Sequence, residues 1–248
     1  MKETMKVKLY GTGALVSKSF SACAMIDDRI LFDCPNGLVR KLRQDNIDFG
    51  KIATIIISHY HADHDYDMFV LLWEFNRVKR KQQLNIIAPK GFEERYKPLV
   101  DMAWPGMFFF TNVMKNVNLN ILEAVDAETF ELGEYNITAY KMNHANCDAY
   151  GYRIKKGERV VAFTGDATMS DNINRLVKGA DIAFIDVTGA PPRNSGLDPV
   201  HFDIPMFIEL KNNHKDVRIM PIHMGDEVYE ELKEKGYNVP SDNDVIEI

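Results

Sequence analysis

The chain has 248 residues, 46% of them hydrophobic, which is enough to bury a core in one or two domains. Its formal net charge of −6 does not suit a protein that holds long nucleic acids by bulk charge. Three cysteines without a CxxC pair argue against a disulfide framework and against a cysteine-rich zinc site. We find neither a membrane span nor a signal peptide, so we expect a cytoplasmic protein that contacts no membrane.

The first half of the sequence predicts short strands separated by helices. Compact runs of Val, Ile and Leu predict strands, whereas apolar residues at helical spacing predict helices. The expected strands are 7–10, 29–33, 54–58 and 84–88, and the expected helices are 37–46, 68–80 and 92–102. Residues 103–111 are rich in aromatic residues and contain Pro105 and Gly106, which predicts a loop. Its rings favour packing in the core or at a dimer interface, with stacking on a bound base as the alternative.

The second half of the sequence also predicts short strands and helices. The expected strands are 118–125, 129–132, 136–142, 151–154, 160–164, 182–187 and 217–222, and the expected helices are 204–212 and 227–235. Strands occur in runs and also alternate with helices. Two sheets packed face to face, each covered by helices, satisfy this pattern. No Pro/Gly/Ser-rich linker divides the chain, so we expect a single domain over residues 1–248.

The strongest chemical signal is the segment His59-Tyr60-His61-Ala62-Asp63-His64, which follows directly after the predicted strand 54–58. A buried strand that ends in three imidazoles and a carboxylate brings nitrogen and oxygen ligands to one point. Neutral imidazole and carboxylate are ligands that suit Zn²⁺, Mn²⁺ or Fe²⁺. The alternative is a polar surface loop, but four ligand-type residues within six positions favour a metal site.

Other predicted strands also end in ligand-type side chains. Asp166 follows the strand 160–164, and His223 follows the strand 217–222. His144 lies just beyond the strand 136–142, and His201 lies at the junction between a loop and a helix. A lone histidine at such a place is usually structural or exposed. Several of them at successive strand ends indicate an active site along one sheet edge.

Taken in order, these residues resemble the ligand series of the metallo-β-lactamase superfamily, and the resemblance covers nearly the whole chain. The segment 11–13 and Asp33, which we expect to support the ligands from behind, also resemble features of that family. The resemblance implies a four-layer αββα sandwich that binds two divalent ions, Zn²⁺ first and Mn²⁺ as the alternative. It also implies that His59, His61 and His144 hold one ion, that Asp63, His64 and His223 hold the other, and that Asp166 bridges both.

Within that superfamily the sequence resembles ribonuclease Z and its phosphodiesterase relatives. Asp186 and His201 match an acidic residue and a histidine that this branch carries ahead of its last ligand. A carboxylate can hold an imidazole in one tautomer while the imidazole meets the phosphate or the leaving oxygen. The resemblance therefore implies catalytic roles for His201 and Asp186, and for Asp63 in orienting or deprotonating water. The alternative for His201 is an exposed loop histidine.

Two departures from the ribonuclease Z pattern bear on the substrate. Asp65-Tyr66-Asp67 replaces the usual apolar-X-Gly turn, and the extra carboxylates would shift the charge near the metals. Only residues 145–165 separate His144 from Asp166, which leaves no room for the arm with which ribonuclease Z grips tRNA. The sequence also resembles anti-Pycsar phosphodiesterases, which lack the arm.

We therefore expect a homodimeric two-metal phosphodiesterase that acts on small phosphodiesters and on no long nucleic acid. The first choice of substrate is a 3′,5′-cyclic mononucleotide, opened to a nucleoside monophosphate. The dimer is implied by the resemblance to ribonuclease Z. Two alternatives remain open, namely a tRNA 3′-processing endonuclease of the ribonuclease Z type and a metal-dependent lactonase or thioesterase.

Overall fold

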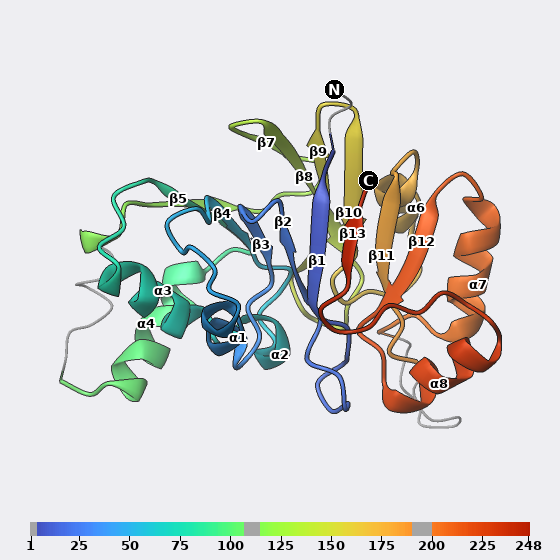
Figure 1. The fold of residues 1–248 in the computed structure, drawn as a ribbon, viewed down its shortest axis with the longest axis horizontal. Helices are drawn as coiled ribbons and strands as arrows, with labels where there is room; N and C mark the ends of the chain where they lie inside the picture. The colour runs from blue at the N-terminus through green and yellow to red at the C-terminus, as the bar shows by residue number, and fades with distance from the viewer. Residues whose placement is uncertain (1–3, 107–114, 190–199) are drawn as a thin grey trace.

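Two β-sheets face each other at the centre of the molecule (Figure 1). The computed structural model describes residues 4–106, 115–189 and 200–248. In spatial order the first sheet consists of β13 (Val245–Glu247), β1 (Lys6–Gly11), β2 (Cys23–Ile26), β3 (Ile30–Phe32), β4 (Thr54–Ile56), β5 (Leu84–Ala88) and β6 (Leu119–Glu123). The second consists of β12 (Arg218–Ile222), β11 (Ile182–Asp186), β10 (Arg159–Phe163), β9 (Ala149–Lys156), β8 (Tyr135–Met142) and β7 (Thr129–Leu132).

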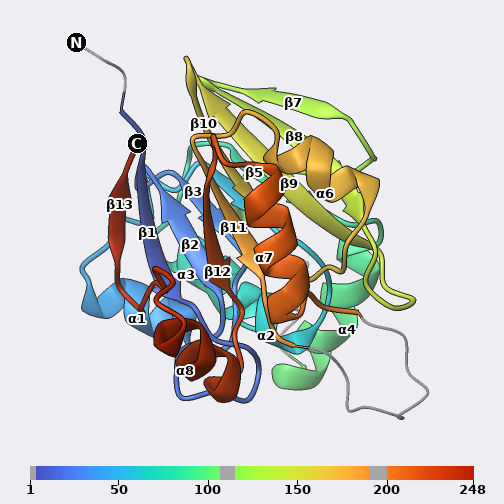
Figure 2. The same cartoon turned by 90° about the vertical axis from the view of Figure 1, so that its right-hand side faces the viewer.

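Helices cover the outer face of each sheet, as the two orthogonal views in Figures 1 and 2 show. Those beside the first sheet are α1 (Leu38–Gln44), α2 (Ala62–Asp65), α3 (Met68–Arg77) and α4 (Phe92–Ala103). Those beside the second are α6 (Asp171–Val177), α7 (Ile204–Asn213) and α8 (Asp226–Glu234). The layers run helix, sheet, sheet, helix, so the predicted αββα sandwich is confirmed.

Three hydrophobic clusters fill the spaces between successive layers. Leu71 and Phe75 of α3 belong to the cluster beneath the first sheet, and Leu210 of α7 belongs to the cluster beneath the second. Between the sheets, the rings of Phe32 and Phe163 stack with centroids 4.6 Å apart. Because both faces of the central strands are covered, those strands are continuous apolar runs rather than alternating ones.

The structure adds four elements that the periodicity did not predict. β2 and β13 are four and three residues long, too short to show a period of two. Both exist because they pair with β1, from opposite sides. The other two are helices, the four-residue α2 and the seven-residue α6, which packs on the second sheet.

Helix α3 ends at Arg77, three residues before the predicted end. Lys79 has a left-handed backbone with φ of 53°, which breaks the helical path. The guanidinium of Arg80 then turns back and donates hydrogen bonds to the carbonyls of Phe49 and Gly50. Long-range contacts, which local periodicity cannot register, therefore set this boundary.

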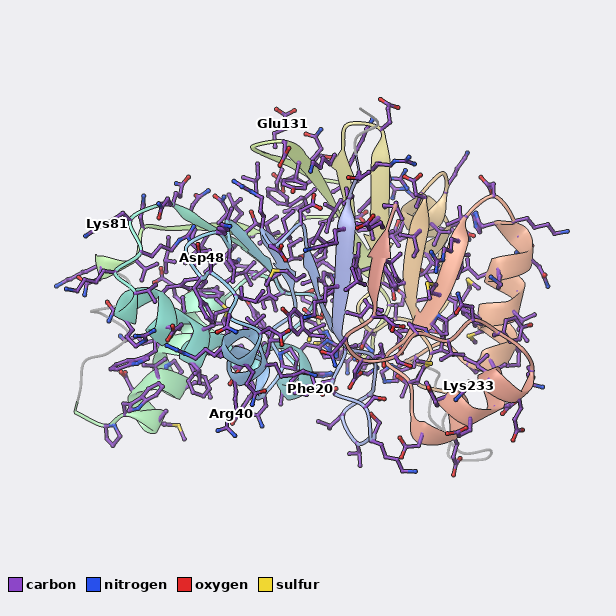
Figure 3. All side chains as sticks on the ribbon, in the orientation of Figure 1. Phe20, Arg40, Asp48, Lys81, Glu131 and Lys233 are labelled. Carbon is purple, nitrogen blue, oxygen red and sulfur yellow. The ribbon has the colours of Figure 1, made fainter. Side chains whose placement is uncertain are left out.

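Charged side chains lie on the outside of the sandwich. In Figure 3 the labelled Lys81, Glu131 and Lys233 project away from the ribbon, and all three are exposed. Among the helices of the described ranges, none combines the length and the apolar character needed to cross a membrane.

Candidate metal centre

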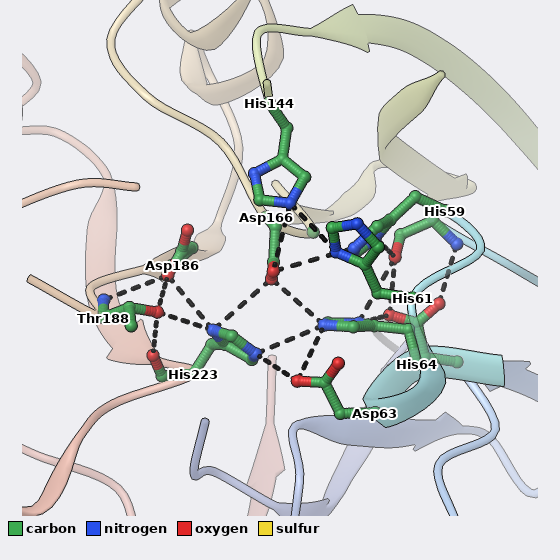
Figure 4. A network of polar contacts seen from close by, with 12 residues as sticks. His59, His61, Asp63, His64, His144, Asp166, Asp186, Thr188 and His223 are labelled. Atoms are coloured by element: carbon green, nitrogen blue, oxygen red, sulfur yellow. Dashed lines mark hydrogen bonds and ion pairs between the residues drawn. The ribbon is translucent and has the colours of Figure 1, made fainter. Parts of the chain in front are cut away.

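The ligand-type residues collect at one edge of the sandwich, where several strands end. Residues 59–64, called the ligand turn below, follow β4 of the first sheet. His144 comes two residues after β8, Asp166 three residues after β10, and His223 directly after β12. Figure 4 shows these side chains converging on a common space between the sheets. The fold therefore brings the ligand-type residues at these strand ends together at one edge, as the sequence predicted.

The ligand turn changes conformation halfway along, which aims its side chains at two points. His61 is extended, with φ −80° and ψ 150°, and it caps the short helix α2. Residues two apart in extended backbone point the same way, so His59 and His61 lie on one side. The helical turn that follows redirects Asp63 and His64. One hexapeptide can thus contribute ligands to two ions.

The first ligand group consists of His59, His61 and His144. Nδ1 of His61 lies 3.2 Å from Nε2 of His144. Nε2 of His59 and Nε2 of His144 each lie 3.7 Å from Oδ2 of Asp166. His59 and His144 are buried, whereas His61 is exposed. Three imidazoles and one carboxylate oxygen therefore face a common centre.

The second ligand group consists of Asp63, His64 and His223. Nε2 of His223 lies 3.2 Å from Nε2 of His64 and 3.2 Å from Oδ2 of Asp63. Oδ1 of Asp166 lies 3.2 Å from Nε2 of His64. Asp166 therefore directs one carboxylate oxygen to each ligand group, as a bridging ligand would.

The donor atoms themselves fit two metal ions. Nε2 of His59 and Oδ1 of Asp166 are buried without a hydrogen-bond partner among the described residues, which is costly unless a cation lies against them. Two nitrogen ligands about 2.0–2.1 Å from one tetrahedral ion lie about 3.3 Å apart. The nitrogen–nitrogen distances of 3.2 Å in both groups match that separation. The imidazole and carboxylate chemistry suits Zn²⁺ and Mn²⁺ alike.

The comparisons with known proteins agree with this geometry. Residues 28–224, most of the chain, match the family described as the beta-lactamase superfamily domain. The chain belongs to this superfamily. The predicted resemblance to the metallo-β-lactamase superfamily is therefore confirmed, whereas the likeness to anti-Pycsar enzymes stays a prediction.

Curated relatives refine the position of the chain within the superfamily. A ribonuclease Z of Picrophilus torridus is 28% identical over 164 residues, which cover 64% of this chain and 50% of that protein. The chain spans about half the length of the curated relatives it matches. This match confirms the predicted likeness to ribonuclease Z.

Solved structures of low sequence identity share the fold. The metallo-beta-lactamase fold protein YhfI of Bacillus subtilis has a TM-score of 0.80 and 18% identity, over 99% of this chain and 100% of that one. A diphosphatase of the PhnP family has a TM-score of 0.75 and 17% identity, over 98% of both chains. Together with the donor set, family membership supports a metal-dependent hydrolase.

A glycine lets the two sheets approach each other at the centre. Gly165 has φ of 58°, and a Cβ atom there would lie 2.7 Å from Cβ of Ser58. Any side chain at this position would push the end of β10 away from the end of β4. Gly165 therefore lets Asp166 and the ligand turn come close enough to share one site.

His201 and Asp186 form the pair that the sequence predicted, and the His201 ring lies near both ligand groups, with centroids 4.9 Å from His144 and 5.7 Å from His223. Nδ1 of His201 lies 2.7 Å from Oδ2 of Asp186 and 3.9 Å from Oδ2 of Asp166. Asp186 is fully buried, whereas the His201 side chain is 20% exposed. The imidazole therefore has one nitrogen held by a carboxylate and remains open to the surroundings.

Electrostatics in the site follow from burial and from the three carboxylates. Burial alone would lower the pKa of His223, but Asp166, Asp186 and Asp63 outweigh it and raise this pKa to about 10. Burial likewise opposes protonation of His201, and Asp186 reverses the effect, so its pKa is raised. Burial would raise the pKa of Asp166, but His223 and neighbouring imidazoles hold it well below its usual range. The carboxylates and the imidazoles of the centre therefore stabilise each other's charged forms.

The structure corrects the expectation for the two carboxylates after the ligand turn. Asp65 points away from the ligands and pairs with the guanidinium of Arg95 in α4, and it also accepts a hydrogen bond from the Tyr96 hydroxyl at 2.9 Å. Asp67 accepts a hydrogen bond from the backbone N–H of Val39 at 2.7 Å. Both carboxylates fasten neighbouring helices, and neither belongs to the groups of described residues that could hold a metal.

The aromatic stretch has one described ring. Trp104 stacks on Trp73 with centroids 5.9 Å apart and meets Phe69 edge-on at 5.6 Å. It packs against the core beneath the first sheet, which agrees with the core interpretation. Phe108, Phe109 and Phe110 lie outside the described residues, so the base-stacking alternative and the homodimer stay predictions.

Two hydroxyl residues at the site were not identified from the sequence. Ser58 and Thr188 both contact ligand histidines from behind. A single Ser or Thr beside a strand end has no distinctive pattern. Only its position between an imidazole and a buried carboxylate marks it.

Proposed function

We propose that this protein is a two-metal phosphodiesterase that opens 3′,5′-cyclic mononucleotides to nucleoside monophosphates. One observation carries the choice of a small substrate. After a short loop, the interval between His144 and Asp166 folds as the hairpin of β9 and β10, which is an integral part of the second sheet. No segment is left there to grip a tRNA body, and a net charge of −6 disfavours a long polyanion.

The two ligand groups would hold the ions, with Asp166 between them. Divalent ions at such a pair of sites neutralise phosphate charge and lower the pKa of water, so that hydrolysis proceeds near neutral pH. The carboxylate of Asp63, which is only slightly exposed, lies at the edge of the second group. There it can orient the attacking water and accept its proton.

His201 is placed to complete the reaction on the other side of the phosphorus. The water oxygen forms the new bond to phosphorus, and the bond from phosphorus to a ribose oxygen breaks. That oxygen needs a proton. The carboxylate of Asp186 favours the protonated imidazole of His201, which therefore donates the proton to the leaving oxygen.

A tRNA 3′-processing endonuclease is the second candidate. It is favoured by the similarity to the Picrophilus ribonuclease Z, which covers half of that protein. A lactonase or a thioesterase would use the same ions to polarise an acyl carbonyl. No described residue beyond the shared ligand set favours an acyl substrate over a phosphodiester.

A substrate panel with Zn²⁺-loaded and Mn²⁺-loaded enzyme tests the proposal. The panel contains 3′,5′-cyclic nucleotides, linear dinucleotides, a precursor tRNA and an acyl-homoserine lactone, with products separated by chromatography. We expect nucleoside monophosphates from the cyclic nucleotides, with purines and pyrimidines both accepted. Cleavage of the precursor tRNA without cleavage of any cyclic nucleotide would replace this proposal by the second candidate.

A further inference from the structure

Two hydroxyl groups lie directly behind the metal-ligand candidates, between ligand histidines and buried carboxylates. One belongs to Ser58, two residues after β4, and the other to Thr188, two residues after β11. Each approaches Nδ1 of a histidine whose Nε2 faces the ligand group, and Nδ1 of His223 lies nearer to Thr188, at 2.7 Å, than to Oδ1 of Asp166, at 3.4 Å. Each is also close to an aspartate that is not itself a ligand.

The contacts of Ser58 define the first connection. Its hydroxyl donates to Oδ2 of Asp33 at 2.8 Å and lies 3.0 Å from Nδ1 of His59, closer than to Nδ1 of His64 at 3.5 Å. The same Asp33 oxygen lies 2.8 Å from Nδ1 of His64. The carboxylate thus accepts directly from a histidine of the second ligand group and, through Ser58, holds a histidine of the first.

The contacts of Thr188 define the second connection. Its hydroxyl lies 2.7 Å from Nδ1 of His223 and donates to Oδ1 of Asp186 at 2.7 Å. The carbonyl of His223, at 2.8 Å, is a competing acceptor, but a charged acceptor makes the stronger bond. The other oxygen of Asp186 holds His201 at 2.7 Å. The two connections follow the same plan, with one imidazole held directly and one through a hydroxyl.

Each hydroxyl has a single proton, and this decides which group donates and which accepts in the two hydrogen bonds that it makes. Because the proton is donated to the carboxylate, the oxygen can only accept from the imidazole, which must then carry its own proton on Nδ1. The lone pair of Nε2 is left facing the ligand group in both His59 and His223. One carboxylate oxygen could hold the proton on Nδ1 of only one imidazole. The hydroxyl between the carboxylate and a second imidazole fixes the proton of that second ring as well.

We propose that Ser58 and Thr188 are positioning residues that each fix the tautomer and orientation of one metal ligand. Ser58 serves His59 and so the first ligand group, and Thr188 serves His223 and so the second. The proposal rests on the pair of metal sites in the proposed function and not on its substrate. Partners behind a metal ligand typically change metal affinity by about 10–100-fold when removed.

Removing each hydroxyl should therefore weaken one ion and spare the other. Ser58→Ala is expected to lower Zn²⁺ affinity about 10–100-fold at the first ligand group, and Thr188→Val to do so at the second. Thr188→Ser, which keeps the hydroxyl, should bind both ions like the wild type. The readouts are competition with a chromophoric chelator, Zn²⁺ content per chain, and anomalous scattering from crystals to show which group has lost its ion.

Thr12→Val is the matched control. The Thr12 hydroxyl is fully buried and donates to Oδ1 of Asp242 at 3.0 Å, but it contacts no imidazole. This variant should keep both affinities. Wild-type binding of both ions by Ser58→Ala and Thr188→Val, or an equal loss at both groups, would overturn the proposal.

A measurement on the wild type needs no variant to fold. In ¹⁵N-detected histidine spectra of the Zn²⁺-loaded protein, His59 and His223 should carry their proton on Nδ1. A proton on Nε2 of either ring contradicts the proposal outright. None of these readouts uses turnover, so the failure of the proposed substrate would leave the result intact, and the reverse also holds.

Discussion

The ligand turn and the strand ends of the second sheet both contribute ligands to the metal centre, but they differ in how far apart those ligands are in the sequence. The turn delivers His59, His61, Asp63 and His64 from six consecutive residues, whereas His144, Asp166 and His223 come from three separate strand ends. The spacing within the turn is set by local backbone conformation. The other three ligands reach it only if the two sheets dock correctly, so three of the seven ligands depend on the fold as a whole.

The two regions also differ in what holds their ligands in place. Behind the turn, Asp33 and Ser58 follow β3 and β4 of the first sheet, and behind the strand ends Asp186 is the last residue of β11 in the second. Asp33 and His223 are both in the left-handed backbone region, with φ of 57° and 53°, a conformation that costs energy in non-glycine residues. Substitutions in each region should therefore break different parts of the centre.

Asp166→Asn removes the link between the regions and should have the largest effect. Its carboxylate oxygens face both ligand groups, and an amide cannot serve both as an anionic ligand. We expect phosphodiester turnover to fall to background and bound metal to fall below two ions per chain. Elemental analysis and a turnover assay measure this, with the exposed Asp148→Asn as control. Two tightly bound ions in Asp166→Asn would refute its bridging position.

His201→Ala tests a residue just before α7 that lies outside the ligand groups. We expect kcat to fall by about 10²–10⁴-fold, because a positioned proton donor contributes this much. Both ions should stay bound, since His201 belongs to neither ligand group. Asp186→Asn should cause a milder loss of turnover. An unchanged rate in His201→Ala, or loss of an ion, would remove the assigned role.

Asp65→Asn tests how rigidly the ligand turn is held. Asp65 is fully buried and paired with Arg95, whose side chain is 26% exposed. Breaking a buried pair costs about 3–5 kcal/mol, and we expect the lower end because Arg95 regains some water. Asp148→Asn breaks the exposed pair with Lys141 and should cost about 0–1 kcal/mol. Urea unfolding compares the two variants, and equal costs would contradict the anchoring role of Asp65.

The pH dependence of stability should separate the metal-free from the metal-loaded state of the centre. The pKa of His223 is raised from 6.5 to about 10. In chelator-treated protein its contribution is therefore complete below pH 6.5 and lost as pH rises toward 10. In metal-loaded protein the trend should reverse, because ions need the neutral imidazole and compete with protons. Parallel unfolding profiles with and without chelator would contradict this.

Much of the architecture was predictable because apolar periodicity is a local property. The long strands and helices were located within a few residues, and the turn chemistry beside β4 indicated metal. The short β2 and β13 were not, because pairing with β1 creates them. The end of α3 was wrong for a related reason, since the distant carbonyls of Phe49 and Gly50 draw Arg80 away from the helical path.

The sequence by itself determined the chemistry of the centre, because ligand types and strand-end positions can be identified residue by residue. Only the tertiary structure decided how that chemistry is arranged. The oxygens of Asp166 divide between the ligand groups, Asp65 faces Arg95 instead of the metals, and the hydroxyls of Ser58 and Thr188 lie behind their histidines. These relations join residues far apart in the chain. They exist only because two covered sheets pack face to face and bring their strand ends to one edge.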